Sequence, residues 1–388
     1  MAACRRRLAV LATVGGMVLA GAVAGTGNAA TATVSAAPRA GAGFDDVVRA
    51  VVYSGTTIYV GGDFRTAVNG TSRTSRGFVA AVDATTGAVT GWAPAVDGPV
   101  TAIAVAGGSV YLGGSFTHVG GAAHRHIAKV SASSGAVDSR FRHTVASPPA
   151  AFATGAGRLY AAGSFTTVDN QPRSHVAAFS LATGALDTRF APTPDGTVHS
   201  VAVAGDRVYL GGAYHKVDGA SGHPRLAAVT TDTGSLVPGF AATVPYEVHR
   251  VAVSGSTVYA ALAGPGGRII AYGSGGAAAW TLTTNGDVYD VTALDGTIYA
   301  AGHFDDACTT SRVADVHGTC LDGQQRRQKL LAADASGRLL PWAPQANGVI
   351  GVIVLAASPS RHSLAVGGTF TTFGTSTARS RFAQFGPS

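Results

Sequence analysis

The chain has 388 residues, a formal net charge of +7 and only 13% charged residues. Three of these charges, Arg5 to Arg7, belong to a leading segment, so the remainder carries about +4 (7 − 3). This mild charge, without a basic stripe and interleaved aromatic residues, does not support a nucleic-acid partner. The 53 glycines and the Val-, Tyr- and Phe-containing runs between them favour an all-β protein.

The first thirty residues have the pattern of a secretory signal peptide. An arginine-rich head precedes an apolar run that ends near Val23, and Ala29 and Ala30 offer small-residue cleavage sites. A membrane anchor is the alternative, but the run is Gly-rich and no later stretch reaches the ~18 apolar residues that a span requires. We predict a signal peptide over 1–30, a secreted domain over 31–388 and no membrane span, with the Sec and twin-arginine routes both open.

A six-residue pattern, Tyr-x-Gly-Gly-x-Phe, then recurs at intervals of about fifty residues. Its seven copies, some of them degenerate, begin at Tyr59, Tyr111, Tyr160, Tyr209, Tyr259, Tyr299 and Ala365. Such a period indicates repeated supersecondary units. The mature chain exceeds the ~250–300 residues at which one hydrophobic core stops growing, and a radial array of sheets gives each sheet its own interface with the next.

The second copy indicates what one unit contains. Strands are expected over 100–105, 110–116, 127–130 and 136–145, with Gly-containing turns between them. Four short antiparallel strands make one propeller blade. The sequence therefore predicts a single seven-bladed β-propeller of four-stranded antiparallel blades, and the short fifth copy leaves six or eight blades as alternatives.

Three further features recur once per unit and favour structural roles. The Gly pair predicts close contact between blades or a bulge, because no helix follows to make a phosphate site. An aromatic residue follows the last hairpin turn and is expected to pack between blades: Trp92, Phe141, Phe190, Phe240, Trp280 and Trp342. An arginine before the third strand is expected to bind backbone carbonyls: Arg76, Arg125, Arg173, Arg225, Arg268, Arg327 and Arg379.

The ends of the array predict how it closes. The last copy ends at its third strand, over 381–385, and the chain stops three residues later. The missing fourth strand would leave an open sheet edge. We therefore expect an N-terminal strand from 31–44 to pair with 381–385 and to close the ring.

The sixth copy carries an insertion with Cys308 and Cys320, the only cysteines after the leading segment. In a secreted chain this pair predicts one disulfide. The alternative is half of a zinc site completed by His303 and His317, but the spacing is not that of a zinc knuckle. No metal or cofactor is predicted.

The repeat resembles a known family. Its pieces are V-x-x-V-A-V-x-G, V-Y-[VL]-G-G-x-F, R-x-x-[VIL]-A-A, T-G and W-x-P, over about 47–385. They resemble the delta-sixty-type repeat of secreted bacterial β-propellers, best known from actinobacteria, and more distantly the Gly pairs of kelch propellers. The resemblance implies a propeller and no particular chemistry, and the fifth copy departs from the pattern.

The candidate site is the mouth of the central channel, where the second residue of each V-x-x-V start should lie. These residues are Arg49, Thr101, Ala150, His199, His249, Tyr289 and Ile353, with Arg250 and Asp290 adjacent. Such a set could bind an anionic or sugar ligand, or a metal through the two histidines. The sequence alone favours a simpler alternative, a solvated polar rim. Other histidines, His118, His124, His126, His215 and His303 among them, are expected on the exposed surface.

Two classes of function remain. No Gly-x-Ser-x-Gly, His-Glu-x-x-His or P-loop motif is present, and Glu247 is the only glutamate. The first class is a monomeric binding or scaffolding module for an extracellular ligand, namely a saccharide, a cell-envelope component or a protein. The alternative is a propeller enzyme, a lyase or hydrolase in which His199 or His249 moves a proton beside Tyr289.

Overall fold

The computed structural model describes residues 33–314 and 318–388. The predicted signal peptide lies outside these residues, so its cleavage stays a prediction. Regular structure in the described part is β throughout, apart from one 3-10 turn over Pro359–Arg361. No helix in those ranges has the length and apolar character to cross a membrane.

Seven sheets repeat one antiparallel strand order, first to second to third. The first strands are β2 (Val48–Ser54), β7 (Val100–Ala106), β12 (Pro149–Gly155), β17 (Val198–Ala204), β20 (Val248–Ser254), β24 (Val288–Leu294) and β31 (Val352–Ser358). The second strands are β3 (Thr57–Gly62), β8 (Ser109–Gly114), β13 (Arg158–Gly163), β18 (Arg207–Gly212), β21 (Thr257–Leu262), β25 (Thr297–Gly302) and β32 (Ser363–Gly368). The third strands are β6 (Val79–Asp83), β11 (Ile127–Ser131), β16 (Val176–Ser180), β19 (Leu226–Thr230), β22 (Arg268–Tyr272), β30 (Leu330–Ala333) and β35 (Phe382–Phe385).

Only one of these seven sheets has the expected fourth strand, which is β23 (Ala278–Thr283). In the second sheet the predicted strand 136–145 is reduced to one bridge, between Val130 and Val137. The cause is Asp138, whose carboxylate accepts the N–H of Arg140 and starts a turn. The segment of β23 has no such turn-forming residue, and its ladder therefore continues.

Short hairpins follow the second strands at the periphery. They are β4 (Thr66–Asn69) with β5 (Ser72–Ser75), β9 (His118–Val119) with β10 (Ala122–Ala123), β14 (Thr167–Val168) with β15 (Gln171–Pro172), β26 (Asp306–Cys308) with β29 (Gln324–Arg326), β27 (Val313–Ala314) with β28 (Thr319–Cys320), and β33 (Thr372–Phe373) with β34 (Thr377–Ala378). A two-residue strand, β1 (Gly43–Phe44), pairs with β4.

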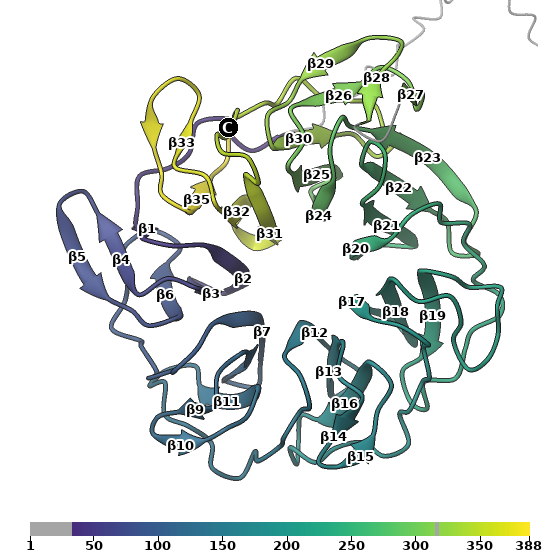
Figure 1. The fold of residues 1–388 in the computed structure, drawn as a ribbon. Helices are drawn as coiled ribbons and strands as arrows, with labels where there is room; N and C mark the ends of the chain where they lie inside the picture. Colours follow the sequence, from purple (N-terminus) through teal and green to yellow (C-terminus); the bar gives the residue numbers. More distant parts are fainter. Residues whose placement is uncertain (1–32, 315–317) are drawn as a thin grey trace, which may run out of the picture. The chain divides into compact units, whose positions relative to one another are not determined.

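The hydrophobic core lies between the sheets rather than inside any one of them. Seven clusters of buried residues each combine side chains from two consecutive sheets, the last pairing β31, β32 and β35 with β2, β3 and β6. In Figure 1 the first strands face one another around the centre of the view. Each sheet thus buries both faces, as a radial array requires.

The first glycine of each pair permits this close packing. A Cβ at Gly61 would lie 2.7 Å from Val100 of the next sheet, and one at Gly113 would lie 2.7 Å from Phe152. Gly367 approaches Val48 of the first sheet in the same way. The predicted blade-to-blade role of the Gly pair is confirmed at these positions.

The recurring aromatic residues also pack as expected. Trp92 meets Tyr59 edge-on at 4.9 Å between ring centroids, and its indole N–H donates to Ser131 of the next sheet at 2.9 Å. Trp342 meets Tyr299 in the same manner at 5.0 Å. These contacts join each Tyr-x-Gly-Gly strand to its neighbour.

The recurring arginine is confirmed in part. Arg76, Arg173, Arg327 and Arg379 occupy one position, three residues before the third strand, and donate to backbone carbonyls. Arg125, Arg225 and Arg268 are displaced from it. His124 and His223 stand there in two sheets, and His223 Nδ1 lies 2.9 Å from the Phe240 carbonyl. Imidazole therefore replaces guanidinium in the fourth sheet, whereas both ring nitrogens of His124 are buried without a hydrogen-bond partner in the described residues. Arg225 and Arg268 still donate to backbone carbonyls from their displaced positions.

The N-terminal segment runs beside the last strand of the array. Val34 forms a bridge with Pro387, and the N–H of Arg39 donates to Gln384 at 2.7 Å. Phe44 is fully buried against Phe64 and Phe382. The pairing has the form of separate hydrogen bonds rather than of a continuous strand.

Candidate functional site

A β-bulge positions every predicted rim residue. In each of the seven sheets the register between the first two strands shifts at the second residue, as between Val288 and Asp290, which leaves Tyr289 unpaired. Bulges re-aim side chains in this way. All seven second residues line one cavity of about 390 Å³: Arg49, Thr101, Ala150, His199, His249, Tyr289 and Ile353. The predicted convergence is therefore observed, and Arg250 and Asp290 line the same cavity.

Three aromatic rings follow one another along one side of this cavity. The rings of His199 and His249 lie 6.1 Å apart between centroids, and His249 meets Tyr289 edge-on at 5.6 Å. Tyr289 in turn stacks on His303 at 6.0 Å. His199, His249 and Tyr289 come from β17, β20 and β24, the first strands of three consecutive sheets. His303 directly follows β25.

His249 and Tyr289 are both held in their neutral forms. Burial lowers the pKa of His249, against the opposing effects of the Glu247 and Asp287 carboxylates. Its Nε2 atom is buried and has no hydrogen-bond partner in the described residues. Burial, helped by Asp287, raises the pKa of Tyr289. At neutral pH the pair can therefore offer one unprotonated ring nitrogen and one phenolic hydroxyl.

Both arginines at this rim already have a carboxylate partner. Arg49 binds Asp63 through two hydrogen bonds of 2.8 and 2.6 Å. His199 Nε2 lies 2.5 Å from a Glu247 oxygen, without the alignment of a hydrogen bond. The guanidinium of Arg250 binds Asp290. The rim is thus polar, and the charge of each of its two arginines is balanced by a carboxylate.

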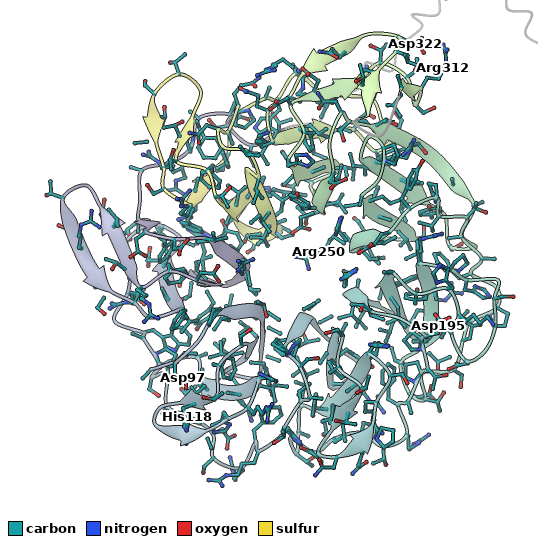
Figure 2. The ribbon with its side chains drawn as sticks, in the orientation of Figure 1. Asp97, His118, Asp195, Arg250, Arg312 and Asp322 are labelled. Carbon is teal, nitrogen blue, oxygen red and sulfur yellow. A yellow bond between two sulfur atoms is a disulfide. The ribbon has the colours of Figure 1, made fainter. Side chains whose placement is uncertain are left out.

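The Arg250–Asp290 pair links three sheets. Arg250 Nε and Nη2 donate to the two Asp290 oxygens at 2.8 and 3.0 Å. The same oxygens accept the N–H groups of Val291 at 2.7 Å and of Leu355, in the next sheet, at 2.8 Å. Burial raises the pKa of Asp290, although these four donors oppose that effect. Figure 2 places Arg250 among the first strands, whereas Asp97, His118, Arg312 and Asp322 lie toward the outside of the view.

One residue missed from the sequence, His303, borders this site. His303 and His126, expected on the exposed surface, are only partly exposed, and His124, which lies away from the cavity, is 2% exposed, so these three expectations were wrong. The signal for His303 was its place directly after the Gly pair. Antiparallel pairing of Val288 with Gly302 brings that position next to the bulged Tyr289.

Metal ligation has little geometric support here. Over 33–314 and 318–388, no group of three or more His, Cys, Asp or Glu side chains is placed to hold a metal ion. Cys308 and Cys320 form a disulfide, as predicted. This bond removes the two thiolates that the zinc alternative required, and His317 lies outside the described residues.

Comparisons with known proteins agree on the fold. A family model described as "Domain of unknown function (DUF5122) beta-propeller" matches residues 157–190, which hold β13 and β16. The WD40 beta propeller domain of Doa1 is similar, with a TM-score of 0.53 and 12% identity over 89% of this chain and 97% of that one. The computationally designed Ika8 protein has a TM-score of 0.51 and 14% identity over the same shares. No curated protein matches the chain.

These likenesses concern the fold alone, because the identities are low. They support an all-β, propeller-like protein. The resemblance to delta-sixty-type repeats is not tested by them and stays a prediction.

Proposed function

We propose that this chain is a secreted, monomeric β-propeller that binds a neutral saccharide at its channel mouth. The saccharide would be extracellular or part of a cell envelope. The proposal includes a signal peptide over 1–30 and a seven-bladed ring over 31–388 that the N-terminal segment closes. The shared strand order of the seven sheets, the contact of Gly367 with Val48, and the bonds of Val34 and Arg39 to the last strand support such a ring.

The observation that carries the proposal is the charge balance of a polar cavity. An anionic ligand would have to compete with Asp63 and Asp290 for the two guanidinium groups that they already hold. Sugar hydroxyls both donate and accept, so they can bind such pairs without displacing either partner. The neutral His249 ring, which lines the cavity, supplies one further polar group. Between the anionic and the sugar ligand that the sequence suggested, this geometry favours the sugar.

The test is binding of the purified protein to an array of neutral and acidic glycans, followed by calorimetric titration. We expect neutral glycans to bind, and we expect His199→Ala with His249→Ala to weaken binding at least about tenfold. His215→Ala is the matched control, because this histidine is exposed and lies outside the cavity. Preferred binding of acidic glycans, or equal affinity of the double variant and the control, would contradict the proposal.

A second function is favoured by one observation, the lowered pKa of His249 beside Tyr289. A neutral histidine can act as a general base. In a lyase, the neutral His249 ring would take the proton next to a sugar carboxyl group, and the Tyr289 hydroxyl would protonate the leaving glycosidic oxygen. The electron pair of the broken C–H bond would form the new double bond.

The two functions differ in the ligand that they need. Elimination requires an acidic sugar, because its carboxyl group acidifies the proton that is removed. Incubation with uronic-acid polysaccharides, followed by ultraviolet absorbance of the unsaturated product, distinguishes them. Product formed by the wild-type chain and abolished by His249→Ala would establish the lyase in place of the binding module.

A further inference from the structure

The loop that leads into the last sheet is longer than its counterparts. Asn285 and Asn347 have the same role, since the side-chain oxygen of each accepts two backbone N–H groups of the neighbouring hairpin. In the sixth sheet the first strand begins at Val288, three residues after Asn285. In the last sheet it begins at Val352, five residues after Asn347. The last sheet therefore has two extra residues beside the channel mouth.

The extra length brings in two exposed apolar side chains. Val349 is 84% exposed and Ile350 is 47% exposed. The sole other large hydrophobic exposed to this degree in the described ranges is Leu321, in the disulfide insertion. Exposed apolar side chains contribute nothing to the core, and beside a cavity they indicate a contact surface.

A second cavity, of about 560 Å³, opens beside this loop. It is lined by Asn285, His303, Asp305, Gln328, Lys329, Asn347, Gly348 and Val349. Lys329 is nearly buried, and its ammonium group donates to the His303 carbonyl at 2.9 Å and to Asp305 at 3.0 Å. A Cβ at Gly351 would lie 2.5 Å from the Lys329 stem, so the loop packs closely on this lysine. The cavity is polar and, like the channel mouth, balanced in charge.

One stacked ring pair separates the two cavities. Tyr289 lines the first and His303 lines the second, and their rings stack with a 24° interplanar angle. His303 Nδ1 accepts the N–H of Asp287 at 3.2 Å, which assigns the ring proton to Nε2. The two cavities therefore adjoin each other at this ring pair.

We infer that the second cavity and the Val349–Ile350 loop form a further saccharide subsite, so that the ligand is an oligosaccharide and not a single sugar. The amide of Gln328 and the carboxylate of Asp305 suit sugar hydroxyls. The aliphatic side chains of the loop suit the apolar face of a pyranose ring. This inference rests on the proposed function of the channel mouth.

The test compares short and long probes. The disaccharides and hexasaccharides of β-1,4-linked glucose, N-acetylglucosamine and mannose would be titrated calorimetrically against three proteins. These are the wild type, a variant that lacks Val349 and Ile350, and Leu321→Ser. The deletion restores the loop length of the sixth sheet, and Leu321→Ser removes an exposed apolar side chain elsewhere. Gln328→Ala is a second variant in case the deletion fails to fold.

We expect the wild type and Leu321→Ser to bind at least one hexasaccharide about tenfold more tightly than its disaccharide. The deletion and Gln328→Ala should lose this gain while keeping the affinity for the disaccharide. Equal affinities for the two lengths, or a gain that both variants keep, would overturn the subsite and leave the channel-mouth proposal intact. No binding of any probe by the wild type would overturn both.

Discussion

The buried carboxylate of Asp290 allows a direct test of how the channel is held together. Asp290→Ala removes the partner of the Arg250 guanidinium and the acceptor of the Val291 and Leu355 N–H groups. Loss of one partner from a buried ion pair costs about 3–5 kcal/mol, and each orphaned donor about 1–3 kcal/mol. These terms are not additive. The Arg250 side chain is 31% exposed and keeps part of its hydration. We therefore expect a loss of about 3 kcal/mol in the free energy of unfolding.

The assay is urea unfolding with linear extrapolation, since a change in stability moves the midpoint in proportion. Arg49→Ala is the matched control. It breaks an equivalent bidentate pair whose arginine is 43% exposed, so it should cost less than about 1 kcal/mol. If Asp290→Ala and Arg49→Ala cost the same, the link between sheets that we assign to Asp290 does not contribute to stability.

Three further predictions concern other parts of the chain. The hydrogen bond from Lys129 outweighs the effect of burial and holds the pKa of Asp138 at about 2. The stability that this pair contributes should therefore be fully present above the unfolded pKa of about 4, and it should be lost as the pH falls from there to about 2. The difference in Tm between wild type and Asp138→Asn should accordingly shrink over that window, and a difference that grows on acidification would contradict the assignment. Deletion of 31–44 removes buried Phe44 and exposes the edge of the last sheet, so Tm should fall by at least about 5 °C; an unchanged Tm would refute closure by this segment. Non-reducing peptide mapping should recover Cys308 and Cys320 in one linked peptide pair, and two free thiols would refute the disulfide.

The repeat made the inner part of the array predictable. Val48, Val100 and Val288 each begin a first strand at the expected place, and the residue that follows each valine lines the cavity. The prediction of these strands succeeded because seven copies of the pattern agree with one another even where a single copy departs from it. The prediction of the fourth, outer strand failed where one side chain changes the local conformation. Asp138 does so by starting a turn that takes the chain away from the neighbouring strand.

The remaining parts of the site depend on contacts between distant segments. His303 faces Tyr289 because Val288 pairs with Gly302, and this register cannot be read from spacing alone. Two of the displaced arginines, Arg125 and Arg225, had a different cause. Once histidine replaces arginine at 124 and 223, the nearest arginine in the sequence is no longer the equivalent residue.

The most direct measurement is a crystal structure of the protein with the hexasaccharide that binds most tightly. We expect sugar density over His199, His249 and Tyr289 that continues across His303 to Val349. Sugar bound only at the periphery of the sheets, with the channel mouth occupied by solvent, would contradict it.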